Sequence, residues 1–400
     1  MRDVAKIDEA VKGAATELIH AGEVQRGDAM PLTTPIYETT TFVFDNAAEV
    51  LAYNEGRSDK FLYSRYTNPT VVSVEAKLAV LDRTEAALLF SSGMGATTTI
   101  LMALLEKGDE VLCGSAIYGG TLHLLNDLLT RFGIAPRFIS LDDLANLERV
   151  ISDRTRLVWF ETPINPTLRC VDIRRIAEAC RARGVTSVID NTFASPINQQ
   201  PLALGIDLAM QSATKYLNGH SDVTGGMVSG TKKLLAPIEK ARRLVGTVMD
   251  PQPAFSLGRG LKTLPLRIAQ HNASARAVAD FLAADRRVSQ VYYPGLPSHP
   301  DHEIARRQMS GFGGMVCFDL DGRYDRAERF YDRLKIVKRA ASLGGIESLI
   351  SMPVLTSQWG HTEEQLRAAG VTKGMLRLSV GLEDVADLIA DLDHALAIKN

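Results

Sequence analysis

The sequence predicts an α/β protein with a mainly parallel, doubly wound sheet and a smaller α+β domain at its C-terminal end. One observation is an alternation of apolar strand-like segments and helical segments between residues 73 and 190. Another is a change near residues 257–260, after which the strict alternation ends. Strands separated by helices form mainly parallel sheets. The chain has 400 residues, more than one ordinary core encloses, so we expect two domains.

The large domain is expected at residues 61–256. Its helices are predicted at 73–82, 95–106, 120–131, 142–150 and 173–183, and its strands at 110–114, 136–140, 156–161 and 186–190. Apolar runs at 207–213 and 225–230 can add two strands. Residues 1–60 show no repeating β-α unit, so we expect them to form an N-terminal arm.

The small domain is expected at residues 257–400 and contains a long amphipathic helix at 263–285. Further helices are predicted at 302–309, 324–334 and 383–397, and strands at 288–293, 313–319 and 375–380. This order indicates an α+β domain with antiparallel strands. The pattern leaves the role of residues 351–374 open, as part of the entrance to a site or as a cover of this domain.

Composition and charge exclude several classes of function. The chain is 46% hydrophobic and 23% charged, and its formal net charge is −2. Lys and Arg are spread along the sequence, so we expect no nucleic-acid partner. The sequence contains neither a signal-peptide pattern nor an apolar run of about 18 residues, so we expect a cytoplasmic protein without membrane contact.

Cysteine and histidine positions give no sign of a metal site. The four cysteines form no C-x-x-C pair and lie in apolar runs, which is typical of buried thiols. No two histidines have ligand spacing beside an acidic residue. We therefore expect neither a disulfide nor a bound metal.

Two charged residues lie where ligands bind in doubly wound sheets, at the carboxyl ends of strands. Asp190 closes the strand at 186–190, and Lys215 follows the apolar run 208–210 and the hydroxyl residues Ser212 and Thr214. Separately, they are also consistent with a turn Asp and a surface Lys. Together they predict a pyridoxal-phosphate site, because a desolvated lysine forms a Schiff base with an aldehyde and an Asp keeps the pyridine nitrogen protonated.

A phosphate group requires backbone donors, and the run from Ser91 to Ala96 precedes an apolar helix. Its glycines permit close approach, and a helix N-terminus presents unpaired N–H groups to an anion. Ser212 and Thr214 can add hydroxyl donors. A tight turn before an ordinary helix has the same appearance, so the motif alone is weak.

Tyr118 follows the strand at 110–114 and can stack on the cofactor ring, although a packed loop aromatic is the alternative. Arg377 is a charge within an alternating strand, and its guanidinium can bind a substrate carboxylate through two hydrogen bonds. Arg65 precedes the large domain, and taken alone it is equally consistent with a solvated loop residue.

With these residues the chain resembles the Cys/Met-metabolism enzymes of the aspartate-aminotransferase-like fold (fold type I), from about residue 30 to the end. This group includes cystathionine γ-lyases, cystathionine γ-synthases and methionine γ-lyases. The matching motifs are Tyr63-Ser64-Arg65, Asn68-Pro69-Thr70, Ser91-Ser92-Gly93-Met94, Tyr118-Gly119-Gly120-Thr121, Asp190-Asn191-Thr192, Ser212-Ala213-Thr214-Lys215-Tyr216, Tyr293-Pro294-Gly295-Leu296, Ser342-Leu343-Gly344-Gly345 and Arg377-Leu378-Ser379.

The resemblance implies that Lys215 holds pyridoxal 5'-phosphate and moves protons, that Asp190 pairs with the pyridine nitrogen and that Tyr118 stacks on the ring. It also implies that Ser342 and Arg377 hold the substrate carboxylate. The implied phosphate contacts come from Gly93, Met94, Ser212 and Thr214 of one subunit and from Tyr63 and Arg65 of its neighbour. The active site would then be shared within a dimer, and two dimers would form a homotetramer.

Three positions leave the exact reaction open. Ala341 stands where cystathionine γ-lyases and γ-synthases typically have Glu, Gly120 where methionine γ-lyases typically have Cys, and Leu343 where β-lyases usually have Trp. We expect a carbon–sulfur lyase of trans-sulfuration type that performs γ-elimination on cystathionine, homocysteine or methionine, with Lys215 as the base and Tyr63 or Tyr118 assisting departure of the thiol.

The alternative within the family is γ-replacement on an activated homoserine ester, as in cystathionine γ-synthase or O-acylhomoserine sulfhydrylase. Two alternatives lie outside it. A transaminase would also use Lys215, but its oxo acid would keep the carbon–sulfur skeleton of the substrate. A non-catalytic cofactor-binding protein would not need the complete set of Asp190, Lys215 and Arg377.

Overall fold

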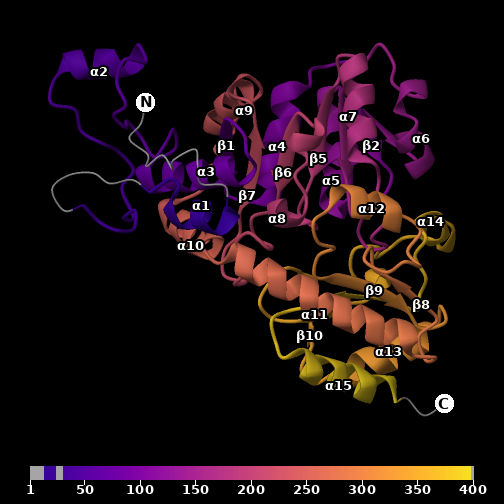
Figure 1. Ribbon diagram of the computed structural model, residues 1–400. Coiled ribbons are helices and arrows are strands. Elements are labelled where there is room, and N and C mark those ends of the chain that lie inside the picture. The colour runs from indigo at the N-terminus through magenta and orange to yellow at the C-terminus, as the bar shows by residue number, and fades with distance from the viewer. Residues whose placement is uncertain (1–12, 24–29, 398–400) are drawn as a thin grey trace.

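The computed structural model describes residues 13–23 and 30–397. Within them the chain forms a seven-stranded sheet and a five-stranded sheet. Figure 1 shows the larger sheet and its helices above, the smaller sheet below, and the long helix α11 (Leu264–Ala284) running beneath the larger sheet. The arrangement confirms the predicted α/β fold with a smaller C-terminal part. The boundaries at residues 61 and 257 stay predictions, which limited proteolysis would test.

The larger sheet has the strand order β1-β7-β6-β5-β4-β2-β3. Its strands are β1 (Ala86–Phe90), β2 (Glu110–Gly114), β3 (Ala135–Ile139), β4 (Thr155–Glu161), β5 (Thr186–Asp190), β6 (Leu208–Gln211) and β7 (Gly226–Gly230). Only β7 runs antiparallel to its neighbours, β1 and β6, and all other pairs in this sheet are parallel. Our sequence analysis did not predict β1, which is short and lies between two helices.

Helices cover both faces of the larger sheet. They are α3 (Pro69–Leu81), α4 (Gly93–Leu104), α5 (Gly119–His123), α6 (Leu141–Ala145), α7 (Ile173–Ala182), α8 (Ser195–Asn198), α9 (Lys232–Val245) and α10 (Pro251–Leu261). Successive side chains of a strand point to opposite faces. In β2, Val111 and Cys113 pack in one cluster with α4 and α9, whereas Leu112 packs with α6 and α7. The helix predicted at 120–131 begins as α5 and continues as a π turn and a 3₁₀ turn to Phe132.

The smaller sheet has the strand order β10-β11-β12-β9-β8. Its strands are β8 (Gln290–Tyr292), β9 (Met315–Asp319), β10 (Lys338–Arg339), β11 (Leu349–Ser351) and β12 (Met375–Ser379), and its helices besides α11 are α12 (His302–Gln308), α13 (Tyr324–Arg333), α14 (Glu363–Ala368) and α15 (Val385–Leu396). In β12, Leu376 and Leu378 pack with residues of α13 and α15, whereas Met375 joins the cluster around Tyr216 of the large sheet's domain. Arg377 alternates with the leucines, so it also faces the larger domain.

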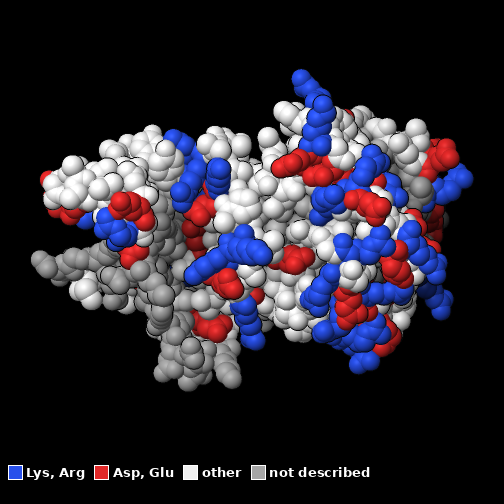
Figure 2. Space-filling model, turned by 90° about the horizontal axis from the view of Figure 1, so that it is seen from above, with Lys and Arg blue, Asp and Glu red and all other residues white. Residues whose placement is uncertain are grey.

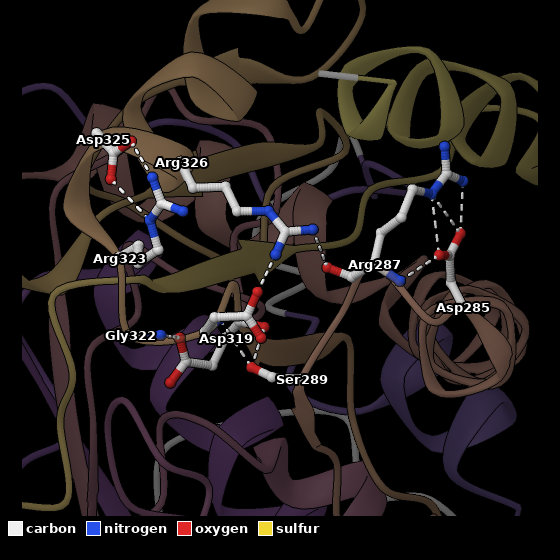
Figure 3. Close-up of polar contacts among 9 residues, drawn as sticks. Asp285, Arg287, Ser289, Asp319, Gly322, Arg323, Asp325 and Arg326 are labelled. Atoms are coloured by element: carbon white, nitrogen blue, oxygen red, sulfur yellow. Dashed lines mark hydrogen bonds and ion pairs between the residues drawn. The ribbon is translucent and has the colours of Figure 1, made fainter. Parts of the chain in front are cut away.

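A polar corner fixes the start of β12. Figure 3 shows Gly322 and Ser289 around Asp319, the last residue of β9, with Arg326 reaching the carbonyl of Arg287. Asp319 Oδ1 accepts from the Gly322 N–H at 2.8 Å, and its Oδ2 accepts from the Thr372 hydroxyl at 2.8 Å. These bonds anchor the chain just before β12, the strand that contains Arg377.

The N-terminal part lies against the larger domain at one end and extends from it at the other. Besides α1 (Ala14–His20), it contains α2 (Ala47–Asn54), which Figure 1 shows standing apart from the body of the molecule and which buries none of its residues. Glu23 forms buried ion pairs with Lys77 at 2.9 Å and Lys262 at 2.8 Å. This contact holds the first part of the described chain against α3 and the end of α10.

Charges of both signs alternate over the face of the molecule drawn in Figure 2, without a large area of one sign. Within residues 13–23 and 30–397, every helix is either too short or too polar to cross a membrane.

Candidate active site

A cavity of about 1480 Å³ opens at the carboxyl ends of the parallel strands and extends to the smaller sheet. Glu161 and Asp190, the last residues of β4 and β5, line it together with Lys215, which follows β6. Arg377 enters from β12, so both domains contribute to the wall. The prediction that the strand ends meet at one crevice is confirmed by this geometry.

Lys215 lies deep in the cavity. Its Nζ donates a hydrogen bond to Ser342 Oγ at 2.9 Å. Burial lowers the pKa of Lys215, and the positive charge of Arg377 lowers it further. The amine is therefore closer to its neutral, nucleophilic form than an exposed lysine is.

The backbone next to Lys215 is fixed by Arg267 of α11, a buried residue that our sequence analysis missed. Its guanidinium donates to the carbonyls of Tyr216 at 2.7 Å, Leu217 at 3.2 Å and Gly260 at 2.8 Å. Burial lowers the pKa of Arg267 to about 10. The only sequence signal is a charge in an otherwise apolar stretch of a helix.

Asp190 and Glu161 are neighbours on the paired strands β5 and β4. Asp190 Oδ1 accepts from the Thr192 N–H at 3.0 Å and from its hydroxyl at 2.5 Å, while burial raises the pKa of Asp190. Burial, with the charge of Asp190, raises the pKa of Glu161 to about 8. Glu161 was not predicted from the sequence, although it carries the signal that identified Asp190, a carboxylate closing an apolar strand.

The start of α4 lines the cavity with Gly93 and Met94, as the phosphate motif predicts. Ser92 caps the helix by accepting from the Gly95 N–H at 2.9 Å, and the first N–H groups of a helix have no partner within it. A Cβ atom at Gly93 would lie 3.1 Å from Ser212 Oγ, so glycine allows the two segments to approach closely. Ser212 and Thr214 also line the cavity.

Tyr118 begins α5 at the cavity, and half of its side chain, 51%, is exposed. Its N–H donates to Glu161 Oε2 at 3.1 Å. A Cβ atom at Gly120 would lie 2.5 Å from Tyr118 Cε1 and 2.9 Å from Met94 Sδ. Any larger residue at position 120 must therefore displace the tyrosine ring.

Arg377 is buried and has a fixed orientation. It donates to Asn165 Oδ1 at 2.9 Å and to the carbonyl of Ser342 at 3.3 Å, and burial lowers its pKa. Within the described chain, Arg377 Nε is buried and has no hydrogen-bond partner. Arg377 also lines the cavity, so the residue is within reach of a ligand there. Asn165 lines the cavity and was missed, because a polar residue before proline indicates only a turn.

Tyr63 and Arg65 do not line the cavity of their own chain. The Arg65 guanidinium lies 4.8 Å from the centre of the Tyr66 ring and donates to the carbonyl of Arg243 at 2.6 Å. The other predicted site residues lie at the cavity, with Ser342 beside Lys215.

The segment that the sequence left undecided forms the outer wall, by which we mean the cavity-lining residues Thr356, Ser357, Gln358, Trp359, His361, Gln365 and Arg367. Trp359 is 74% exposed. No residue of this described outer wall is Asp or Glu. Ala341 also lines the cavity.

The cavity fits pyridoxal phosphate in three respects. Lys215 supplies a partly buried amine with a lowered pKa, and Asp190 is a partly buried carboxylate that a protonated pyridine nitrogen would neutralise. The start of α4 offers backbone donors for a phosphate. A fold-type-I sheet with these groups at its strand ends defines a pyridoxal-phosphate-dependent enzyme.

Comparison with known proteins agrees with this class. The family model described as Cys/Met metabolism PLP-dependent enzyme matches residues 15–397, and the chain belongs to that family. It is 42% identical to L-methionine gamma-lyase of Pseudomonas putida over 96% of this chain and 97% of that protein. It is also 42% identical to chloroplastic cystathionine gamma-synthase 1 of Arabidopsis thaliana, over 94% of this chain and 68% of that protein. The crystal structure of cystathionine gamma-lyase from Lactobacillus plantarum, complexed with L-serine, superposes with a TM-score of 0.89 at 37% identity, covering 96% of this chain and 99% of the other.

Proposed function

We propose that this pyridoxal-phosphate enzyme is a carbon–sulfur lyase that performs γ-elimination on homocysteine, methionine or cystathionine. The observation that carries the proposal is the position of Lys215, whose partly buried amine has a lowered pKa and lies beside Ser342 and near the charge of Arg377. When bound, pyridoxal phosphate supplies an aldehyde for the amine and a protonated ring that withdraws electrons from the substrate.

The inner wall, by which we mean Glu161, Asp190, Lys215 and Arg377, binds and orients the cofactor and the substrate. Arg377 takes the substrate α-carboxylate, helped by Ser342, because its guanidinium is held by Asn165 and the residue lines the cavity. Asp190 lines the cavity and would keep the pyridine nitrogen protonated. Gly93, Met94, Ser212 and Thr214 surround the phosphate.

Lys215 is also the group that moves protons. Its Nζ removes the proton from Cα of the substrate and then relays protons at Cβ. Tyr118 lines the cavity, where its ring would stack on the cofactor and its hydroxyl would protonate the departing thiol, a role that Tyr63 of a neighbouring subunit can share. The result is a free thiol and, after hydrolysis, 2-oxobutyrate and ammonia.

The outer wall supports a substrate without a second ammonium group. Its described residues include no carboxylate, and Arg367 adds a positive charge. Ala341 supplies no carboxylate either. Homocysteine and methionine need no anionic partner at their distal end, so the wall favours them over cystathionine.

Product analysis tests the proposal. Purified enzyme saturated with cofactor is incubated with homocysteine, methionine and cystathionine, and 2-oxobutyrate is quantified. We expect 2-oxobutyrate from homocysteine or methionine at a higher kcat/KM than from cystathionine. Formation of no oxo acid from any of the three would refute the lyase, and an oxo acid that keeps its sulfur would indicate a transaminase.

A second candidate is γ-replacement, in which sulfide or a thiol replaces the acyl group of an activated homoserine ester. The lack of a carboxylate at the outer wall is compatible with it, because sulfide needs no contact for a distal ammonium group. Three relatives at 40–42% identity are named cystathionine gamma-synthase, one of them as a probable one. Product formation from O-acylhomoserine plus sulfide, exceeding 2-oxobutyrate formation from all three thiol and thioether substrates, would favour it.

We also propose that two chains share each active site and that two such dimers form a homotetramer. Tyr63 and Arg65 lie outside the cavity of their own chain, and the N-terminal part exposes Leu32 by 88% and Val43 by 89%, which suits contact with a second copy. A mixture of Tyr63→Phe and Lys215→Ala chains, unfolded and reassembled together, should be more active than the two variants measured separately in the same amounts. Failure of the mixed sample to exceed the separate ones would exclude a shared site, and light scattering would distinguish a dimer from a tetramer.

The cytoplasmic location expected from the sequence remains a proposal. The four cysteines are free, buried thiols, as we expected, which accords with a reducing compartment. Cell fractionation would test it.

A further inference from the structure

The role of Glu161 follows from what its two carboxylate oxygens bind. Oε2 accepts from the N–H of Tyr118 at 3.1 Å, on the segment after β2. Oε1 accepts from the N–H of Asn165 at 3.3 Å, on the segment after β4. One carboxylate therefore joins two segments that both line the cavity.

Each of these segments ends in a group of the proposed site. Tyr118 supplies the ring that would stack on the cofactor. Glu161 holds the backbone N–H of this same residue, so the contact fixes the point from which the ring extends. Asn165 Oδ1 accepts from Arg377 at 2.9 Å, so the asparagine orients the guanidinium that takes the substrate carboxylate. The chain of contacts runs from Tyr118 through Glu161 and Asn165 to Arg377.

Burying the carboxylate of Glu161 beside Asp190 is energetically unfavourable, which indicates that this position serves the site. Its side chain is only 6% exposed, and it lies directly beside Asp190 on the neighbouring strand. Two buried carboxylates side by side repel each other when both are ionised. The other ionisable groups around Glu161 are Arg377 of β12 and the thiol of Cys113 of β2. A neutral glutamine could hold one of the two loops without that repulsion.

We propose that Glu161 is a positioning residue that couples the cofactor clamp, by which we mean Tyr118, to the substrate clamp, by which we mean Asn165 and Arg377. It does so by holding the backbone of Tyr118 with one oxygen and that of Asn165 with the other. This proposal rests on the roles proposed above for Tyr118 and Arg377. It does not depend on which sulfur compound is the substrate. Loss of the carboxylate should weaken two separate binding steps at once.

The matched control is Glu110, a second buried strand-end carboxylate with the same exposure of 6%. It lies at the start of β2, at the opposite end of the sheet, and accepts from Thr155 Oγ1 at 2.6 Å and Ser152 Oγ at 2.9 Å. It does not line the cavity. A Glu110→Gln substitution thus removes a buried charge without touching the site.

The experiment measures two dissociation constants for wild type, Glu161→Gln and Glu110→Gln. Cofactor affinity is obtained by titrating the cofactor-free protein with pyridoxal phosphate, and carboxylate binding by titrating the loaded protein with glycine and following the absorbance. For Glu161→Gln we expect both constants to rise by about tenfold, because the NH2 group of the amide faces one of the two N–H donors, and the side chain must shift from the position in which it holds the two segments. Glu110→Gln should change neither. Equal constants in Glu161→Gln and wild type, or equal changes in both variants, would overturn the proposal.

A second variant keeps the test decisive if Glu161→Gln does not fold. Asn165→Ala removes the contact to Arg377 but leaves the contact between Glu161 and Tyr118, so it should weaken glycine binding by about tenfold and leave cofactor affinity unchanged. Unchanged glycine binding would overturn the proposal. Because glycine contains no sulfur, these outcomes are independent of whether the protein proves to be a γ-lyase.

Discussion

The inner and outer walls of the cavity differ in how their residues are held. Glu161, Asp190 and Arg377 close or lie within strands, and Lys215 lies four residues after β6. Their side chains are buried or partly buried and have fixed hydrogen-bond partners. The outer wall lies on turns and the short helix α14, and several of its side chains, such as Trp359, are exposed. Rigid strand ends suit the cofactor chemistry that the family shares, whereas loops allow the distal end of the substrate to vary.

The largest effect should come from removing the amine of the inner wall. Lys215→Ala should lower kcat by about 10³-fold or more, because both the covalent link to the cofactor and the proton-moving group are lost. The measurement is steady-state turnover together with the visible absorbance of the purified protein. Lys233→Ala, on an exposed face of α9, is the control and should behave as wild type. Substantial turnover by Lys215→Ala would contradict the role of this residue.

Asp82 is a buried carboxylate that does not line the cavity. A substitution there therefore measures the effect of burial on stability without changing the chemistry of the inner wall. Burial raises the pKa of Asp82 to about 7 from 3.8, and Asp82 accepts a hydrogen bond from Ser229 at 2.5 Å. The folded state thus binds this proton more tightly than the unfolded state, so stability should fall as the pH rises from about 4 to about 7. Asp82→Asn should remove that slope and stabilise the protein at pH 8 by up to about 4 kcal/mol.

Urea unfolding at several pH values measures this difference. Cofactor affinity serves as the control, since Asp82 does not line the cavity and the substitution should leave it unchanged. A variant that is less stable than wild type at pH 8 would show that the ionised carboxylate is favourable where it lies.

The substrate clamp should show an intermediate effect. Arg377→Lys keeps the charge but loses the fork that joins Asn165 and the substrate, so KM should rise by about 10- to 100-fold, with a smaller change in kcat. The measurement is KM and kcat for the best substrate, and Arg339→Lys on exposed β10 is the control. An unchanged KM would assign the carboxylate to another residue.

The smallest effect is expected at the outer wall. Arg367→Glu places a carboxylate where the distal end of the substrate lies, so kcat/KM for cystathionine should improve about fivefold relative to methionine, as expected for an exposed charge contact of about 1 kcal/mol. Cofactor affinity should stay at the wild-type value. If the substitution weakens the cofactor but leaves substrate preference unchanged, the division into two walls is wrong.

The same division explains how much could be predicted from the sequence. The alternation of helices and strands predicted the large sheet, and Asp190, Lys215 and Arg377 were found because a charge in or directly after an apolar strand is unusual. Glu161 carries the same signal as Asp190 and was overlooked. Asn165 could not be found, because its partner Arg377 lies more than 200 residues away in the sequence. The outer wall has no periodic pattern, since turns and a six-residue helix impose none.

The measurement that tests the account most directly is the chemical identity of the cofactor-bearing residue. Holoenzyme is reduced with borohydride, which converts the bond between the cofactor and its lysine into a stable amine, and the digested protein is mapped by mass spectrometry. We predict the pyridoxyl group on the peptide that contains Lys215 and on no other lysine. A pyridoxyl group on a different lysine, or a bound cofactor that no lysine retains, would contradict the assignment of the inner wall.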